Sequence, residues 1–566
     1  MMDKKTILVV VGCLIALLAS QLVVNKIYPP KPKAPRLPAT AVTNAAASAT
    51  ATPNPVGKPA EAAPARASAV VEPEEPRPTE QTITLSNNYV RMEFTSWGGG
   101  VKEVELLKHK ANGHGQVVLN GKDFVPALAL TGITNAGPDT AYSIEQLAPN
   151  TVVMKRRTKT GLEITKTFNL GDAYLLSNTV EIARASQAAA ALPGPVGFVI
   201  GTATPVSVKE APSFLTASWL AGEKYQYRDV SHIAKNAGKG ITGEAINARW
   251  GAVNDQFFTK ILTPGTNAVA IEYKQVELTP PPDWTAKQPP LGVSATLKCL
   301  PTTMTADTAE RYAFTWYAGP KEYERLEALR GGQEEAMQFG FWGVISVVLL
   351  KSMKFFYKLI PNYGVSIIII TILIKILFWP IQAKSIKSMK AMQKFQPLMN
   401  KLREKYKDDA QRLNSEMMKL YKEHKINPFA GCLPMVVQIP VFFALFSMLR
   451  SAIELRGASF LWIRDLSSPD TLFHVAGFPI NLLPLLMTSL SIWQMKITPQ
   501  TGDQQQQKMM MFMPLMMLFF FYSTSAGLVL YWTVQQFLSI AQQWWGMRQR
   551  DNAAPGGPLV STGKTK

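Results

Sequence analysis

The chain has 566 residues, of which 47% are hydrophobic, and it carries a formal net charge of +19 at pH 7. This length allows several domains, and the positive charge indicates an anionic partner, either lipid headgroups or nucleic acid. The three cysteines (Cys13, Cys299 and Cys432) are too scattered for a disulfide framework or a metal site, and the five histidines form no recognisable zinc motif. We therefore expect neither a metal nor any other cofactor.

Near the N-terminus, Lys4 and Lys5 precede an apolar run over residues 7–24. A cleaved signal peptide is one interpretation, but Leu17 occupies position −3 before Ala19, where cleavage requires a small residue. We predict an uncleaved transmembrane signal anchor over residues 1–28, with its N-terminus inside the cell. Residues 29–80 are rich in proline and alanine without an apolar period, which is typical of a flexible linker.

An alternation of apolar and polar residues predicts short strands from residue 82 to about residue 317. Val90, Met92 and Phe94 alternate with Arg91 and Glu93, for example. We predict an antiparallel β-sandwich domain over residues 81–333, on the outer side of the membrane. No catalytic motif is recognisable in it, so a structural or partner-docking role is favoured over binding of a sugar or a peptide.

Residues 334–360 are predicted to form an amphipathic helix that lies in the membrane interface. The lysines at 351, 354 and 358 follow helical spacing and leave an apolar opposite face. A transmembrane helix is the alternative for this segment.

The most apolar segment, residues 361–382, is long enough to cross the ~30 Å hydrocarbon core as a helix, yet it contains Lys375. A lysine at the centre of a transmembrane helix costs about 2.5–3.5 kcal/mol on insertion scales, so its presence requires an explanation. Snorkelling to the nearer interface is the simplest alternative. Because Thr371 and Gln382 share the face of Lys375, we predict instead that this lysine lines a wet cavity walled by protein.

Residues 384–427 carry twelve Lys or Arg against five Asp or Glu and are predicted to form a helical hairpin with its turn at residues 407–409. The positive charge places this hairpin in the cytoplasm. Topology alone could explain the charge. The alternative is an arm that contacts ribosomal RNA, a nascent chain or anionic lipid.

Four further apolar segments predict transmembrane helices over residues 432–449, 480–495, 509–522 and 528–545. The last segment carries a polar stripe on one face, formed by Tyr531, Gln535, Ser539 and Gln542. With the anchor and the Lys375 helix, the fold class is an α-helical polytopic membrane protein with six transmembrane helices and an antiparallel β-sandwich domain on the outer side. Both termini, including a tail over residues 549–566, are expected in the cytoplasm.

Three motifs of the membrane half resemble the YidC membrane protein insertases. They are MMKLYKEHKINP at residues 417–428, GCLPMVVQIPVFFAL at residues 431–445 and GLVLYW at residues 527–532. The large periplasmic domain resembles the Gram-negative branch of this family. The resemblance implies a bacterial inner-membrane protein with a peripheral helix at residues 334–359 and a five-helix insertase core over residues 361–548.

Members of this family carry a positive residue in a hydrophilic groove that opens to the cytoplasm and to lipid, and the matching residue here is Lys375. Many relatives have arginine there, whereas lysine is a point charge without the bidentate geometry of a guanidinium. Thr371, Gln438, Tyr531 and Trp532 match other groove or substrate-contact positions, and helical spacing adds Gln535.

The resemblance implies a non-enzymatic insertase and chaperone for inner-membrane proteins. The implied partners are nascent membrane proteins, the Sec translocon, the lipid bilayer and, through the hairpin and tail, the ribosome, with no small-molecule substrate. A solute transporter is a rival, but the sequence shows no internal repeat with paired broken helices. An intramembrane enzyme is a second rival, but the apolar segments contain no aspartate pair, Ser–His set or metal motif.

Overall fold

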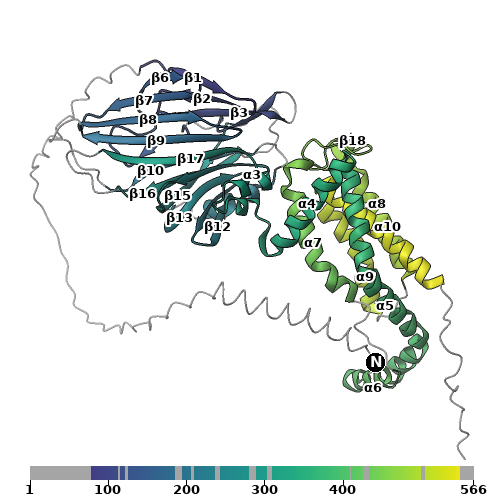
Figure 1. The fold of residues 1–566 in the computed structure, drawn as a ribbon. Helices are drawn as coiled ribbons and strands as arrows, with labels where there is room; N and C mark the ends of the chain where they lie inside the picture. Colours follow the sequence, from purple (N-terminus) through teal and green to yellow (C-terminus); the bar gives the residue numbers. More distant parts are fainter. Residues whose placement is uncertain are drawn as a thin grey trace, which may run out of the picture. The chain divides into compact units, whose positions relative to one another are not determined.

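The computed structural model describes residues 78–548 with several gaps (Figure 1). The gaps are residues 112–114, 122–124, 185–193, 206–209, 236–241, 280–288, 302–308, 408, 425–432 and 499–503. The predicted anchor, nearly all of the linker and the C-terminal tail lie outside the described residues. Residues from Thr79 onward form one compact unit.

Antiparallel strands make up the first part of this unit, as the alternating pattern predicted. A four-stranded sheet runs in the order β1 (Thr82–Ser86), β2 (Val90–Thr95), β3 (Gly100–Lys110) and β4 (Gln116–Leu119). A thirteen-stranded sheet contains β5 (Leu130–Thr131), β6 (Ser143–Ala148), β7 (Thr151–Arg157), β8 (Leu162–Leu170), β9 (Leu175–Arg184), β10 (Val196–Ala203), β11 (Thr216–Ala221), β12 (Lys224–Asp229), β13 (Thr242–Asn254), β14 (Phe258–Pro264), β15 (Ala268–Glu277), β16 (Leu291–Cys299) and β17 (Glu310–Pro320).

The period-two pattern decides which face of each strand is buried. In β2, Val90, Met92 and Phe94 are completely buried, and the ring centroid of Phe94 lies 5.3 Å from that of Phe168 on β8. Removing such side chains from water is the main force that holds these strands together. Two short helices, η1 (Pro212–Phe214) and α2 (Val230–Lys235), interrupt the strands. The β-rich domain is thereby confirmed.

Three short helices and one longer helix connect the β domain to the rest of the helical region. They are α3 (Tyr323–Ala328), η3 (Gln333–Met337), η4 (Gly340–Trp342) and α4 (Gly343–Leu359). The predicted single helix over residues 334–360 is therefore wrong in its first part. Gln338 and Gly340 adopt positive φ angles of 56° and 66°, which no α-helix accommodates, so the regular helix begins only at Gly343.

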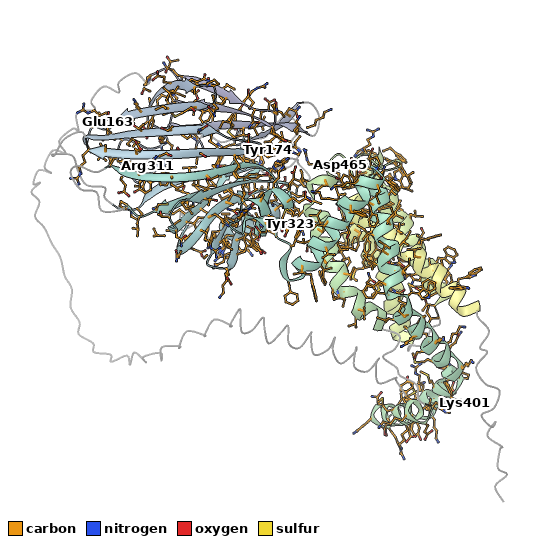
Figure 2. All side chains as sticks on the ribbon, in the orientation of Figure 1. Glu163, Tyr174, Arg311, Tyr323, Lys401 and Asp465 are labelled. Carbon is orange, nitrogen blue, oxygen red and sulfur yellow. The ribbon has the colours of Figure 1, made fainter. Side chains whose placement is uncertain are left out.

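The Lys375 segment belongs to a single helix of 43 residues, α5 (Tyr363–Lys405), which also includes the first arm of the basic hairpin (Figures 1 and 2). The apolar span predicted over residues 361–382 lies at the start of this helix, which continues beyond Gln382. Asn362 caps the helix start, because its side chain accepts a hydrogen bond from the Val365 N–H at 3.1 Å. Pro380 removes only one backbone donor, and α5 continues beyond it.

The remaining helices are α6 (Ala410–Glu423), α7 (Leu433–Ser451), α8 (Leu482–Ile497), α9 (Gln504–Phe521) and α10 (Ala526–Arg548). They lie within a few residues of the predicted segments. A 3-10 turn, η6 (Ile453–Leu455), follows α7, and a hairpin of β18 (Thr471–Val475) and β19 (Phe478–Asn481) precedes α8. Within the described part of the chain, the segments Gly340–Leu359 and Tyr363–Lys405 are long and apolar enough to cross a membrane.

Many apolar side chains of the helical region face outward. Leu377 on α5 is 70% exposed and Phe519 on α9 is 80% exposed, in contrast to the closed core of the β domain. Extensive apolar exposure of this kind marks a surface that is covered by lipid or by a partner.

Candidate functional site

Lys375 lies inside the helical region, with only 5% of its surface exposed. Its Nζ donates a hydrogen bond to Ser539 Oγ of α10 at 2.7 Å, and this hydroxyl donates to the Gln535 carbonyl at 2.8 Å. The side chain therefore ends on a neighbouring helix rather than at the helix surface. This geometry favours a protein-walled site over simple snorkelling.

A second polar pair links α7 to α10. Gln438 Nε2 donates to the Tyr531 hydroxyl at 2.7 Å, and Tyr531 is 1% exposed. An amide in an apolar helix needs such a partner, because an unpaired polar group there costs several kcal/mol. The pair fixes both side chains on facing sides of the two helices.

Trp532, the residue after Tyr531, makes aromatic contacts with α7 and α9. Its ring centroid lies 5.1 Å from that of Phe442 on α7 and 5.7 Å from that of Phe521 on α9. Its indole Nε1 is buried and has no hydrogen-bond partner among the described residues. The same holds for Oε1 of Gln382, Oε1 of Gln535 and Nε2 of Gln542.

These four unpaired polar atoms come from α5 and α10, the two helices that the Lys375–Ser539 hydrogen bond joins. A buried donor or acceptor without a partner costs about 1–3 kcal/mol, so each of these atoms calls for water or a ligand. The arrangement can therefore hydrate, hold or guide a polar group inside an apolar helical environment.

The structure brings together four of the six predicted groove residues in two places. Lys375 binds Ser539, whose hydroxyl donates to the Gln535 carbonyl on the same helix. Gln438 is hydrogen-bonded to Tyr531. Thr371 is fully buried, but its hydroxyl donates to the Ile367 carbonyl of its own helix at 2.7 Å.

Sequence reasoning left Ser539, the hydrogen-bond partner of Lys375, out of the groove residues. Its position four residues after Gln535, on the polar stripe of the last helix, was the available signal. No group of three or more His, Cys, Asp or Glu that could hold a metal occurs in the described part of the chain.

Ion pairs attach α4 to its neighbours. Lys354 lies 2.8 Å from Glu324 of α3 and 3.5 Å from Glu454 of η6. Lys351 lies 3.7 Å from Glu327 of α3. The start of the helical region is thereby linked to the end of the β domain.

A β domain followed by apolar helices that carry buried, paired polar side chains defines a membrane-embedded protein with a large extramembrane domain. Comparison with known families gives a more specific assignment. Residues 82–352 match the family described as YidC periplasmic domain, and residues 355–553 match the 60Kd inner membrane protein family.

The sequence is also similar to those of two proteins named as YidC insertases. The membrane protein insertase YidC of Pelobacter propionicus is 34% identical over 82% of this chain and 86% of its own. The insertase YidC of Cupriavidus necator is 33% identical over 83% of each chain. An active YidC insertase crystal structure is 17% identical with a TM-score of 0.36, covering 82% of this chain and 92% of its own. The chain belongs to the YidC family of membrane protein insertases.

Proposed function

We propose that this protein inserts inner-membrane proteins through a hydrophilic groove formed by α5, α7 and α10. The observation that carries the proposal is the buried Lys375 amine on Ser539, with unpaired polar atoms on the same two helices. The Gln438–Tyr531 pair extends the polar path to α7, and Thr371, Trp532 and Gln535 complete the proposed groove.

The groove lowers the cost of moving a hydrophilic tail through hydrocarbon. Each charge on such a tail costs several kcal/mol in a dry membrane, and a wet path shortens the dry distance. Lys375 attracts acidic residues of the tail and offsets part of their cost. A lysine does this as a point charge, without the two-pronged geometry of arginine.

The apolar part of the substrate has an exit on the exposed helix surfaces. Phe443 on α7 and Phe512, Met516 and Phe519 on α9 are all 48–80% exposed. A hydrophobic segment that leaves the groove along these faces reaches lipid without crossing water.

The proposal includes the finer architecture expected from the sequence. It comprises six transmembrane helices, a periplasmic β-sandwich docked by α3 and α4, an interfacial α4, and cytoplasmic termini. The positively charged α5–α6 hairpin and the tail are proposed to contact the ribosome, and the protein is proposed to act alone or beside the Sec translocon.

Site-specific photocrosslinking tests the groove. A photoreactive amino acid replaces Gln535 in the proposed groove or Leu377, which is 70% exposed on the other side of α5. A stalled single-span substrate with a hydrophilic N-terminal tail should crosslink to position 535 through its tail. Tail crosslinks at position 377 but none at position 535 would contradict the proposed path.

A further inference from the structure

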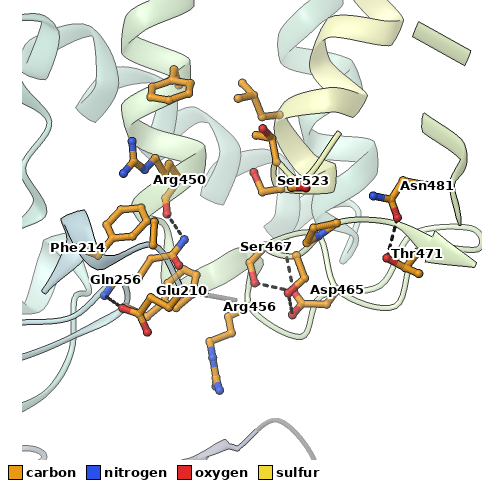
Figure 3. A pocket seen from close by; sticks show the side chains of 18 of the residues that line it. Glu210, Phe214, Gln256, Arg450, Arg456, Asp465, Ser467, Thr471, Asn481 and Ser523 are labelled. Carbon is orange, nitrogen blue, oxygen red and sulfur yellow. Dashed lines mark hydrogen bonds between the residues drawn. The ribbon is translucent and has the colours of Figure 1, made fainter. Parts of the chain in front are cut away.

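A cavity of about 580 Å³ lies where the β domain meets the ends of the helices (Figure 3). Phe214 and Gln256 contribute from the β domain, and Arg450 contributes from the end of α7. The loop before β18 and the turn between α9 and α10 form the opposite wall, where Ser523 lies (Figure 3).

The cavity continues the line of the proposed groove. Leu528 of α10 lines it, and the residues that follow on the same helical face are Tyr531, Gln535 and Ser539. Eleven residues separate Leu528 from Ser539, which corresponds to roughly 16 Å along a helix. Phe446, also in the cavity wall, lies two helical turns beyond Gln438 on α7.

Two arginines, Arg450 and Arg456, line this cavity, and Arg450 lies at the end of α7. Its guanidinium lies 4.0 Å from the ring centroid of Phe214 and donates to Ser213 Oγ at 3.1 Å. None of the described carboxylates lies within ion-pair distance of it. A guanidinium held in place by an aromatic ring can still bind a carboxylate with two parallel hydrogen bonds.

The other charged groups of the wall each make at least one hydrogen bond. Asp465 accepts hydrogen bonds from the backbone N–H groups of Gly457 and Ser467, both at 2.9 Å, and from the hydroxyls of Ser467 and Ser468. Glu210 accepts from the Gln256 N–H at 2.7 Å. Arg456 Nη1 donates to the Lys110 carbonyl of the β domain at 2.7 Å, and its buried Nη2 has no hydrogen-bond partner among the described residues.

The rest of the wall suits a polypeptide chain. Hydroxyl and amide oxygens can accept further hydrogen bonds, so they match the N–H groups of an extended peptide. Most of these side chains already donate one hydrogen bond within the protein, as Thr471 does to Asn481 (Figure 3). They come from the β domain, the loop before β18, the β18–β19 hairpin and the α9–α10 turn: Gln256, Ser467, Thr471, Asn481, Ser523 and Thr524.

We propose that this cavity is a receiving site for the acidic tail of a substrate once that tail has passed Lys375. The occupant is a short, extended, acidic peptide segment, bound by Arg450 through a carboxylate and by the surrounding hydroxyls through its backbone. The proposal rests on the insertase function proposed above. Arginine binds a carboxylate with two hydrogen bonds, whereas lysine offers a point charge. The acidic tail is therefore bound more tightly at Arg450 than at Lys375, which opposes its return into the groove.

The test uses the full-length protein in proteoliposomes and a single-span substrate with an acidic N-terminal tail. A photoreactive amino acid replaces Ser523, an exposed residue of the cavity wall, or Gln535 in the groove. Both positions should crosslink to the acidic tail. A tail with Asn and Gln in place of its acids should lose several-fold more crosslinking at position 523 than at position 535.

The charge is tested by Arg450→Gln, which should lower crosslinking at position 523 and insertion of the acidic-tailed substrate several-fold. Insertion of the neutral-tailed substrate should be unchanged, and Arg450→Lys should restore part of the loss. The control is Arg311→Gln on the β domain, whose side chain is exposed and pairs with Glu181 (Figure 2).

Three outcomes would overturn the receiving site. Tail crosslinks at position 535 without any at position 523 would refute it and leave the insertase groove standing. An equal loss for both substrates in Arg450→Gln would assign Arg450 a structural role. Crosslinking of position 523 to anionic phospholipid instead of the tail would identify a headgroup site. Absence of tail crosslinks at both positions would instead refute the insertase path itself.

Discussion

Lys375 on α5 donates a hydrogen bond to Ser539 on α10, with Nζ and Oγ 2.7 Å apart. The two residues are 164 positions apart in the chain, and their contact joins the most apolar helix to the last one. A lysine held in this way presents its charge at a fixed place inside the helical region. Several predictions about insertion depend on that place.

Substitutions of Lys375 should affect substrates according to the charge of their tails. Lys375→Ala should reduce insertion of an acidic-tailed substrate by about tenfold or more, since a hydrogen bond or ion pair to a charged group contributes roughly 1.5–3 kcal/mol. Lys375→Arg should be tolerated because it keeps the charge, and Lys375→Glu should be the most harmful because it repels the tail. Insertion yield is measured in proteoliposomes.

The control for this series is the same substrate with Asn and Gln in place of its tail acids. Lys375→Ala should leave its insertion nearly unchanged. An equal loss for both tails would show that Lys375 is a structural lysine.

Ser539 is expected to position the Lys375 amine. Ser539→Ala removes the acceptor, so acidic-tailed substrates should insert a few-fold less well while neutral-tailed ones are spared. Ser539→Thr retains a hydroxyl and should restore insertion. If Ser539→Ala lowers the insertion of both substrates equally and Ser539→Thr does not restore that insertion, the hydroxyl contributes to helix packing instead.

Deletion of residues 82–317 should leave insertion of neutral-tailed substrates largely intact, because the proposed groove residues all lie on α5, α7 and α10. The insertion yield of acidic-tailed substrates should fall several-fold, because the deletion removes the Phe214 ring beside Arg450. The measurement is insertion yield at matched expression. A stably expressed deletion variant that inserts neither substrate would contradict this division of roles.

Cysteine labelling in intact spheroplasts tests the topology. A cysteine at Asn414 on α6 should resist an impermeant reagent, while one at Ser177, exposed on β9, should react. Cys299 is 1% exposed and should contribute little background, and the other two cysteines are replaced by serine. Strong labelling at position 414 would reverse the assigned orientation.

Lys166 should make the stability of the β domain depend on pH. Its Nζ is fully buried and donates to the carbonyls of Gly98, Gly99 and Leu128 at 3.1, 2.6 and 3.1 Å. Burial lowers its pKa from 10.5 to about 7. Between these two values the unfolded chain binds more protons than the folded one, so stability rises with pH across this window.

The variant Lys166→Met should lose this part of the pH dependence. The midpoint of thermal unfolding, followed by the β-sheet circular dichroism of the full-length protein, should rise less between pH 7 and pH 9.5 than in the wild type. Lys274→Met, an exposed lysine on β15, is the matched control and should keep the wild-type slope. Identical slopes in all three proteins would mean that Lys166 stays protonated in the fold.

The sequence by itself determined the β-rich domain, the positions of most helices and the family. Period-two alternation such as Val90, Met92 and Phe94 states which strand face is buried, and long apolar runs identify membrane helices, because both signals are local. Local signals did not predict where helices begin and end when this depends on neighbouring segments. The α5 helix continued through Pro380, and positive φ angles at Gln338 and Gly340 divided a segment that had been predicted as one helix.

Only the tertiary structure decided which polar groups meet. The spacing of the last helix placed Tyr531, Gln535 and Ser539 on one face, but a periodic pattern does not specify the facing residue on another helix. Packing of α5, α7 and α10 paired Lys375 with Ser539 and Gln438 with Tyr531. The cavity beside Arg450 is likewise formed by segments far apart in the chain, from residue 210 to residue 528, so no stretch of sequence contains it.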